Sequence, residues 1–424
     1  MKQKDDSSKK KKLLLKNTIM LYILTFSTYF FNLVTVPYQT RVLGPEVYGN
    51  IGFALAFVSY FKIVFDFGFI LSATEAVSKN RENKEELGKI LTAVNILKTS
   101  FVAISTIILA VLILSIDRFR SDPLLYILFF IYVSIDAFLP DFLYRGLENM
   151  KIITYRSVAI RLLFTLMIFV FLKDSSQYYV VPILNIVGSV IAVLSVYIHV
   201  HRKLGVKRQK VDKKYIFKTL KNSALFFLSR IASTIYNSTN TLALGFAYPT
   251  GPNVGLYTSA NKITTTAQSA MSPISDSVYP YMIKNHDFKL IKKILMICEP
   301  IIIVGCIGVG IFAEPICKLL FGEEYAGAAP VLRIMLVTIA VTLPNYILGF
   351  PTMAPLGISK YANYSVIIAA VWQAISLVVL FVTGTFNLYS VCFATMITEC
   401  LVLVLRIFFI KKHWNKSKGM KSKE

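Results

Sequence analysis

The sequence predicts an all-α polytopic membrane protein with twelve transmembrane helices in two pseudo-symmetric six-helix lobes. Of the 424 residues, 55% are hydrophobic and only 16% are charged, and the mean hydropathy is +0.61. Soluble domains carry about a quarter charged residues. Long apolar stretches recur from Thr18 to Ile410, and a helix of about 20 apolar residues spans a bilayer.

The apolar stretches define twelve predicted helices, of which the eighth is the least hydrophobic. Their ranges are 17–36, 49–73, 89–115, 123–144, 155–172, 178–201, 217–246, 253–283, 291–314, 330–350, 361–383 and 386–410.

The basic residues predict the orientation in the membrane. The chain has 46 Lys and Arg residues and a net charge of +23. Outside the predicted helices, the side opposite the N-terminus carries only Arg41, Arg118, Arg120, Lys173 and Lys318. Because cytoplasmic loops collect Lys and Arg, we expect both termini in the cytosol. The same bias explains the net charge without a nucleic-acid partner.

The predicted domains follow from this arrangement and from traces of duplication. "PEVYG" (45–49) is similar to "PNVGLY" (252–257), and Leu43-Gly44 recurs as Leu244-Gly245. Two parallel repeats are typical of transporters. The domains are a basic cytosolic tail (1–16), an N-lobe (17–201), a basic cytosolic linker (202–216), a C-lobe (217–410) and a second basic cytosolic tail (411–424).

The sequence contains no pattern that indicates catalysis or a metal site. The five cysteines and four histidines are scattered, and their spacing matches neither a disulfide framework nor a metal site. A Walker A motif is absent from the sequence. We therefore expect no enzyme activity, no metal and no cofactor.

Charged residues inside the predicted helices are the candidate functional residues. Burial of a charge at the bilayer centre costs roughly 2.5–3.5 kcal/mol on insertion scales, so such residues usually face a partner or a cavity. Seven cations qualify: Lys62, Lys98, Arg161, Arg230, Lys262, Arg333 and Arg406. Lys62, Arg230 and Lys262 lie deepest, whereas Arg161, Arg333 and Arg406 are near helix ends and are predicted to reach the headgroups.

The seventh and eighth predicted helices carry polar faces. Their candidate polar residues are Asn237, Asn240, Tyr257, Asn261 and Gln268. Such residues could hydrogen-bond to neighbouring helices in a packed core. Alternatively, they line a hydrated, cationic cavity, which we favour because their number exceeds what helix packing needs.

Lys62 and Asp66 have two interpretations. Their i,i+4 spacing allows them to neutralise each other. Alternatively, Lys62 faces the cavity, and Asp66 orients it or binds a proton. With Asp136 and Glu399, Asp66 is a candidate for coupling to H+ or Na+, because a buried carboxylate can carry a proton. Asp141 is predicted to pair with Arg145 at i+4.

Several stretches resemble a known family. They include "PYQTRVLGPEVYGNIGFALAFVSYFKIVFDFGF" (37–69), "YRGLENMKIITYRSVAIRLLF" (144–164), "LALGFAYPTGPNVGLYTSANKI" (242–263), "LLFGEEYAGAAPVLRIM" (319–335) and "APLGISKY" (354–361). These stretches resemble the Wzx-type polysaccharide-unit flippases of the MOP superfamily, which also contains the MATE transporters.

The resemblance implies a MATE/MOP-like fold and a flippase in the bacterial plasma (inner) membrane. The implied substrate is an undecaprenyl-pyrophosphate-linked oligosaccharide repeat unit, moved by alternating access for capsule, O-antigen or exopolysaccharide synthesis. Implied partners are the lipid-linked oligosaccharide, membrane lipids, a polysaccharide polymerase and glycosyltransferases. Arg41 matches the arginine of the family's R-x-LG stretch, and Lys62, Arg230 and Lys262 are candidate cavity cations for the substrate.

Three alternatives remain open at the level of sequence. The first is a flippase for a peptidoglycan or teichoic-acid precursor, which would have a similar cationic cavity. The second is a multidrug/cation antiporter of the same superfamily, which predicts acidic residues deep in the first lobe. The third, a membrane glycosyltransferase or polymerase, requires a large catalytic loop, and the loops of this chain are short.

Overall fold

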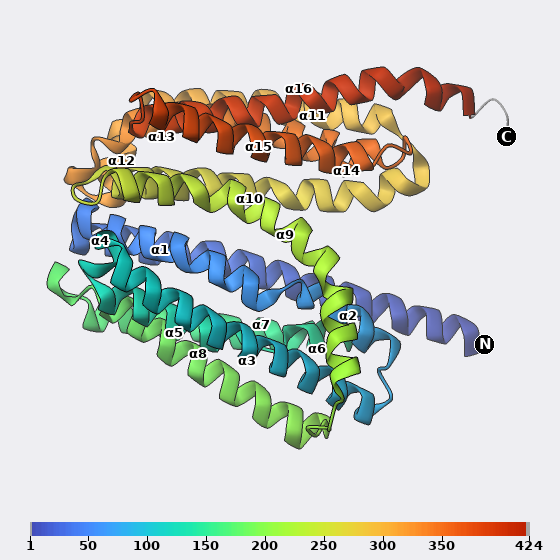
Figure 1. Cartoon of the computed structure of the whole chain (residues 1–424). Helices are drawn as coiled ribbons and strands as arrows, with labels where there is room; N and C mark the ends of the chain where they lie inside the picture. Colours follow the sequence, from blue (N-terminus) through green and yellow to red (C-terminus); the bar gives the residue numbers. More distant parts are fainter. Residues whose placement is uncertain (1, 421–424) are drawn as a thin grey trace. The chain divides into compact units, whose positions relative to one another are not determined.

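The computed structural model describes residues 2–420, and within this range the chain is helical and contains no strand (Figure 1). Side chains are described except at 2–15, 18, 225, 228–230, 232–237, 280 and 415–420. The all-α class is therefore confirmed for the described residues.

The chain divides into two compact units. Unit 1 contains residues 1–43 and 54–234, and unit 2 contains residues 44–53 and 235–424. The chain therefore passes between the units within two long helices, α1 (Lys2–Asp66) and α9 (Lys213–Ala247). The boundaries of the predicted lobes stay a prediction.

Unit 1 contains most of α1, the first part of α9 and the helices between them. These are α2 (Phe69–Lys79), α3 (Lys84–Ser115), α4 (Asp117–Arg120), α5 (Pro123–Ala137), α6 (Asp141–Gly146), α7 (Met150–Phe171), the 3₁₀ turn η1 (Ser175–Gln177), α8 (Val180–His199) and the π-helical turn η2 (Val200–Leu204).

Unit 2 contains the rest of α9 and the following helices. These are α10 (Asn253–Asn285), α11 (Phe288–Ile311), α12 (Ala313–Phe321), the 3₁₀ turn η3 (Glu323–Tyr325), α13 (Ala328–Leu348), α14 (Phe350–Met353), α15 (Lys360–Val382) and α16 (Leu388–Met420).

The long helices make this a multi-pass membrane protein. Among the described residues, nine helical segments are long and apolar enough to cross a membrane, and one of them, Ile19–Lys79, contains two predicted helices. Each of the twelve predicted ranges is largely helical, but 49–73, 123–144, 291–314 and 330–350 each extend across the end of one helix into the next. The helices α9 and α10 are not among the nine, because their polar residues lower their hydropathy. A count of exactly twelve membrane crossings therefore stays a prediction.

The first long helix is interrupted at Gly44, where φ is +70° and ψ is 169°. It ends at Phe67 and Gly68, which both have positive φ values. Glycine adopts this backbone conformation without the steric cost that a side chain adds. At Gly68 a side chain is also excluded by space, since a Cβ atom would lie 2.7 Å from Cβ of Phe226.

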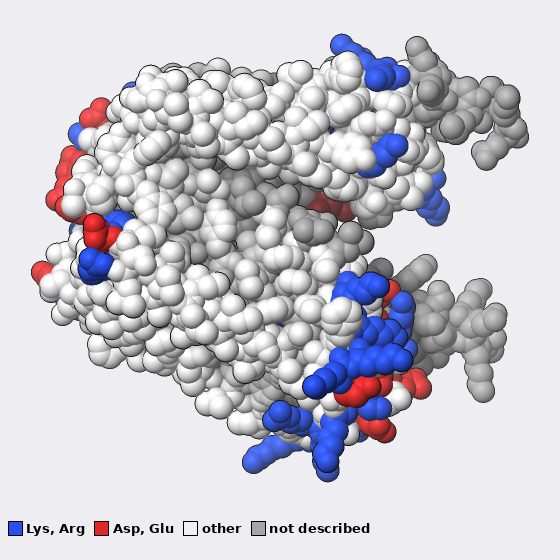
Figure 2. Space-filling view, in the orientation of Figure 1, with Lys and Arg blue, Asp and Glu red and all other residues white. Residues whose placement is uncertain are grey.

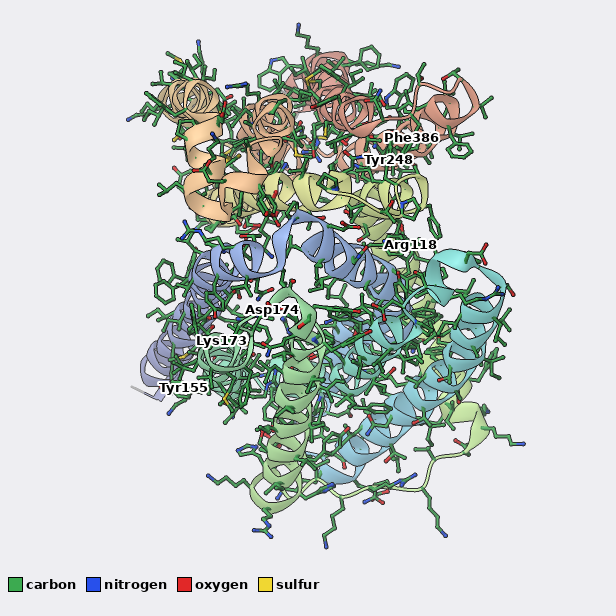
Figure 3. The ribbon with its side chains drawn as sticks, turned by 90° about the vertical axis from the view of Figure 1, so that its left-hand side faces the viewer. Arg118, Tyr155, Lys173, Asp174, Tyr248 and Phe386 are labelled. Carbon is green, nitrogen blue, oxygen red and sulfur yellow. The ribbon has the colours of Figure 1, made fainter. Side chains whose placement is uncertain are left out.

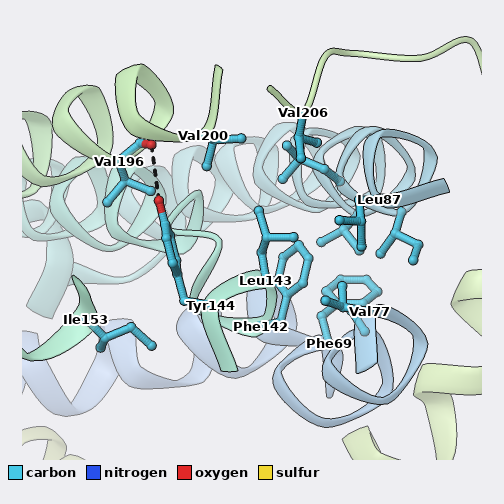
Figure 4. Packing of buried hydrophobic residues seen from close by; sticks show 14 of the residues in the cluster. Phe69, Val77, Leu87, Phe142, Leu143, Tyr144, Ile153, Val196, Val200 and Val206 are labelled. Atoms are coloured by element: carbon cyan, nitrogen blue, oxygen red, sulfur yellow. Dashed lines mark hydrogen bonds between the residues drawn. The ribbon is translucent and has the colours of Figure 1, made fainter. Parts of the chain in front are cut away.

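Unit 1 has a hydrophobic core at the end where α2, α3, α6 and α8 meet (Figure 4). Phe69, Leu143 and Val200 are almost completely buried there. The hydroxyl of Tyr144 donates to the carbonyl oxygen of Val196 at 3.5 Å, which satisfies a polar atom inside the core. This core fixes the short helix α6 between α2 and α8, and α6 contributes to the candidate site described below.

In unit 2, the segment 44–53 of α1 packs closely against α10. A Cβ atom on Gly49 would lie 2.6 Å from the backbone nitrogen of Gly255, and one on Gly255 would lie 1.8 Å from the carbonyl oxygen of Pro45. The two "PEVYG"/"PNVGLY" stretches that the sequence analysis compared therefore contact each other. Only glycine permits this backbone approach.

The loops at one end of unit 2 are also connected. The hydroxyl of Tyr248, after α9, donates to the carbonyl oxygen of Phe386, before α16, at 3.0 Å, and the two residues lie next to each other in Figure 3. Within unit 1, Arg118 follows α3 and Lys173-Asp174 follow α7 (Figure 3).

Candidate functional site

Unit 1 contains a polar cavity of about 600 Å³ among its helices. We call it the unit 1 cavity. Its charged lining residues are Lys62, Asp66, Lys98, Asp136, Asp141, Arg145, Arg156 and Arg161, and polar residues such as Asn32, Tyr132, Asn185 and Ser189 complete the lining. Every one of these residues lies within a candidate membrane-spanning segment. So many charges at membrane depth mark a functional site.

The cavity lies where two helices are broken. Helix α1 ends just after Asp66, and α5 is separated from α6 by the stretch Phe138–Pro140. Proline cannot donate the backbone hydrogen bond of a continuing helix. Non-helical backbone at membrane depth is tolerated only where protein covers it or where it lines a polar cavity. The broken helices therefore present both backbone ends and charged side chains to the same cavity.

The ammonium of Lys62 pairs with Asp136 across helices. Its Nζ lies 2.7 Å from Oδ2 of Asp136 on α5. Of the two interpretations of Lys62 and Asp66, mutual neutralisation is wrong, because Lys62 pairs with Asp136 instead. Lys62 and Asp66 both line the cavity, as the alternative interpretation requires of Lys62. Lys62 remains 42% exposed, so its ammonium can still reach an anion that enters the cavity.

Asp141 pairs with Arg156, not with Arg145 as the i,i+4 spacing predicted. The guanidinium donates to both carboxylate oxygens, at 2.8 and 3.2 Å. The Arg156 side chain is only 9% exposed. Such a two-pronged pair fixes the geometry of both partners. The nearby Arg145 has a buried Nε atom without a hydrogen-bond partner among the described residues, so it contributes a further positive charge.

Lys98 and Arg161 interact with backbone carbonyl groups. The buried Lys98 donates from Nζ to the carbonyl oxygen of Ala137, the last residue of α5. A cation at a helix C-terminus satisfies carbonyl groups that lack a partner and interacts favourably with the helix dipole. Arg161 donates from Nη1 to the carbonyl oxygen of Leu24 and to Oγ of Ser27, both at 3.4 Å. Arg161 therefore lies in the cavity rather than reaching the headgroups as predicted.

The charges of the cavity do not cancel. Five cations and three carboxylates line it. Two carboxylates are already held in ion pairs with Lys62 and Arg156. The remaining excess of positive charge favours an anionic ligand, because phosphate and carboxylate groups accept charge-assisted hydrogen bonds from Lys and Arg.

Lys262 and Arg41, two other predicted cavity cations, do not line the unit 1 cavity. Lys262 lies on α10 of unit 2 and is partly exposed, and its ammonium makes no ion pair within the described residues. Arg41 is exposed on α1. The side chains of Arg230 and Asn237 lie outside the described residues. The predicted substrate contacts of these residues stay predictions.

Asn240 and Tyr257 lie in the interior of unit 2, where each is only 2% exposed. Asn240 donates to the Tyr257 hydroxyl at 3.0 Å and to Thr395 at 2.8 Å, and it accepts from Gln373 at 2.7 Å. These bonds join α9, α10, α15 and α16, as the helix-packing interpretation describes. Their predicted contact with substrate stays a prediction.

Gln268 and Glu399 of unit 2 also connect helices. Gln268 donates to Thr342 on α13 at 3.1 Å, and Asn261 is partly buried on α10. The carboxylate of Glu399 accepts from Asn345 at 3.0 Å. Arg406 is buried and donates to the carbonyl oxygen of Asn345, so the expectation that it reaches the headgroups is wrong.

The sequence analysis missed the roles of Lys98, Arg156 and Arg161 in the cavity. A signal was available in "AFLPDF" (137–142), where a proline and an aspartate interrupt an apolar run. A helix break at membrane depth needs partners for its free carbonyl groups. The nearest cations along the helices are then candidates to supply them.

Comparison with known proteins gives the family context. A family model described as "Polysaccharide biosynthesis protein" matches residues 14–286. A protein of Escherichia coli (strain K12) named "Putative O-antigen transporter" is 26% identical over 94% of this chain and 97% of its own length. A protein of the same name from Shigella dysenteriae is 24% identical over 93% of this chain and its whole length.

Two solved structures share the fold. The structure "Lipid II flippase MurJ, inward closed conformation" has a TM-score of 0.69 at 13% identity and covers 95% of this chain and 90% of that chain. An inward-facing multidrug resistance MATE family transporter of the MOP superfamily has a TM-score of 0.65 at 16% identity. The alignment covers 92% of this chain and 96% of that chain. At these identities the likeness concerns the fold alone.

Proposed function

Because this chain belongs to the polysaccharide biosynthesis protein family, we propose that it is a flippase for lipid-linked polysaccharide precursors. The resemblance to Wzx-type flippases of the MOP superfamily is confirmed by the family match and the similar proteins. The similar proteins are named as transporters or as a flippase, which supports the proposal that this chain is not an enzyme. The proposed substrate is an undecaprenyl-pyrophosphate-linked oligosaccharide repeat unit in the bacterial inner membrane, with both termini of the chain in the cytosol.

The single observation that carries this proposal is the excess of positive charge in the unit 1 cavity. A cavity with five cations and three carboxylates suits the pyrophosphate of a lipid-linked sugar. The hydroxyl and amide side chains around it, such as Asn32, Asn185 and Ser189, suit the hydroxyl groups of a sugar. Without such a site, a charged glycan headgroup would lose its hydration in the bilayer, which is strongly unfavourable.

The same observation disfavours a multidrug/cation antiporter. That alternative predicts an acidic cavity in the first lobe. The unit 1 cavity does contain Asp66, Asp136 and Asp141, but two of them are already paired with cations. A cationic drug would therefore meet net repulsion in this cavity.

We propose alternating access between two lobes as the mechanism. The substrate headgroup enters the cationic site from the cytosolic side while its lipid tail stays in the bilayer, and rocking of the lobes exposes the headgroup outside. Coupling to H+ or Na+ through Asp66, Asp136 or Glu399 is part of the proposal. Movement of one charge through 100 mV supplies about 2.3 kcal/mol. A polysaccharide polymerase and glycosyltransferases are the proposed functional partners.

The test is complementation of a flippase-null bacterial strain, with surface polysaccharide as the readout. We expect the wild-type chain to restore surface polysaccharide, and Lys62→Ala and Arg230→Ala to abolish it at normal protein levels. The matched control is Lys79→Ala, which removes a lysine from an exposed ion pair with Glu75. Full export by both variants would refute the role of Lys62 and Arg230 as substrate cations.

A second arm separates the related substrates. The same chain is expressed in a strain that lacks its peptidoglycan-precursor flippase, and growth is measured. We expect no rescue of growth, because the proposed substrate is a polysaccharide repeat unit. Rescue of growth without restored surface polysaccharide would instead support the peptidoglycan or teichoic-acid alternative.

A further inference from the structure

A second polar groove lies on the surface of unit 1, between α3 and α8. It encloses about 600 Å³, and Phe138, just after α5, contributes to its wall. Most of its polar residues lie toward the linker that follows α8, namely Thr92, Asn95, Tyr197, His201 and Arg208. None of these residues lines the unit 1 cavity, so the groove is a separate feature.

The linker is fixed to α3 at the polar end of the groove. The backbone nitrogen of Gln209 donates to Oγ1 of Thr92 at 3.2 Å, and Val206 is buried. A Cβ atom on Gly88 would lie 2.3 Å from the carbonyl oxygen of Lys207, so the linker backbone lies directly on α3. Arg208 is therefore held between anchored neighbours at the rim of the groove.

Arg208 is available for an anion. Its side chain is exposed, and it forms no ion pair within the described residues. Segment 201–214, "HRKLGVKRQKVDKK", contains seven Lys or Arg residues and one aspartate. Figure 2 shows Lys and Arg side chains gathered at this end of unit 1. A phosphate that approaches the groove therefore meets a positive field and one positioned guanidinium.

The polar groups beside Arg208 are positioned by hydrogen bonds. Asn95 donates from Nδ2 to the hydroxyl of Tyr197 at 2.8 Å, and that hydroxyl donates to the carbonyl oxygen of Phe138 at 3.2 Å. Nδ1 of His201 lies 2.9 Å from the carbonyl oxygen of Val206. These bonds hold the side chains in place before a ligand arrives, which lowers the entropic cost of binding.

Away from the linker, the groove becomes apolar. Ile96 and Val193 line it, and the hydroxyls of Thr99 and Ser100 donate to carbonyl groups of their own helix. Further along α3 the exposed residues are apolar, including Ile104 and Ile107 at 56% and 67% exposure. The groove is thus polar at one end and continues into the apolar surface that faces the bilayer.

We propose that this groove binds an anionic phospholipid from the leaflet next to the basic linker. The phosphate contacts Arg208 beside His201 and Asn95, and one acyl chain lies between α3 and α8 along Ile96 and Val193. Basic pockets between transmembrane helices bind anionic lipid headgroups in this manner. A free phosphate would use only the polar end and leave the apolar wall without a partner. This inference does not depend on the proposed substrate.

The experiment measures lipid retention by the purified full-length chain in detergent. Native mass spectrometry counts bound phosphatidylglycerol and phosphatidylcholine after equal exposure to both. We expect the wild-type chain to retain more phosphatidylglycerol than phosphatidylcholine. In Arg208→Gln this preference should fall about fivefold, because one basic side chain near a lipid headgroup contributes about 1 kcal/mol to binding. The matched control is Lys210→Gln, which removes the same charge from the same linker at a residue outside the groove.

Two further arms make the result decisive. Ile96→Trp should fill the apolar part and lower retention, whereas Ile107→Trp, on the same helix but outside the groove, should not. Glycerol phosphate at millimolar concentration should not displace the lipid. Equal losses in Arg208→Gln and Lys210→Gln would show diffuse attraction and overturn the proposal. Displacement by glycerol phosphate, or unchanged retention in a folded Ile96→Trp variant, would also overturn it.

Discussion

The contact between Gly255 and Pro45 gives the sharpest test of the fold. The substitution is Gly255→Ala, which adds a single methyl group to α10. An ideal Cβ atom at this position would lie 1.8 Å from the carbonyl oxygen of Pro45, whereas real Cβ atoms essentially never approach other heavy atoms within 3.0 Å. The backbones of α10 and of segment 44–53 must therefore separate by more than about 1 Å, the difference between these distances.

The size of the effect follows from two opposing contributions. Overpacking of a close contact costs about 1–3 kcal/mol, and the upper part of this range applies because the obstacle is backbone and cannot rotate away. Alanine favours a helix interior over glycine by about 1 kcal/mol. We therefore expect a net loss of about 1–2 kcal/mol in the free energy of unfolding of unit 2.

The assay is thermal unfolding of the purified protein in detergent, followed by tryptophan fluorescence. For a unit of about 200 residues, this loss corresponds to a decrease in Tm of about 2–8 °C. The matched control is Gly305→Ala on α11, where an added Cβ atom meets nothing within 4 Å. That variant should keep the wild-type Tm or raise it slightly. Equal Tm values for the two variants would refute the close contact between α1 and α10.

Three further predictions concern the charged and polar interior, and each is checked by the amount of folded protein and by surface polysaccharide in the complementation strain. Asp141→Asn leaves the part-buried guanidinium of Arg156 without its carboxylate and should lower the folded fraction. Breaking a fully buried ion pair costs about 3–5 kcal/mol, and this pair should cost less because Asp141 is 25% exposed. A normal folded fraction would contradict a structural role for the pair. Lys98→Met removes the cation that caps the C-terminus of α5 and should destabilise unit 1, whereas Lys98→Arg should keep most of the stability. Equal folded fractions for the two variants would argue against the cap. Gln373→Leu leaves the Asn240 oxygen without its donor and should cost about 1–3 kcal/mol, and unchanged stability would show that water replaces the lost donor.

The amino-acid sequence alone determined the helical class and the positions of the helices. Each predicted range is largely helical, because a continuous apolar stretch of about 20 residues satisfies its backbone in a bilayer only as a helix. The helix breaks inside four of these ranges were not predicted. The sequence also indicated the family resemblance through stretches such as "PYQTRVLGPEVYG" (37–49). These properties depend on residues that are close together along the chain.

Only the tertiary structure decided which charges meet. Lys62 was four residues from Asp66 but pairs with Asp136, and Asp141 was four residues from Arg145 but pairs with Arg156. In a low-dielectric interior, the favoured partner is the one that packing brings within hydrogen-bond distance, whatever its separation along the chain. Helix breaks after Asp66 and before Asp141 set these distances, and they create the unit 1 cavity from residues that no local pattern connects.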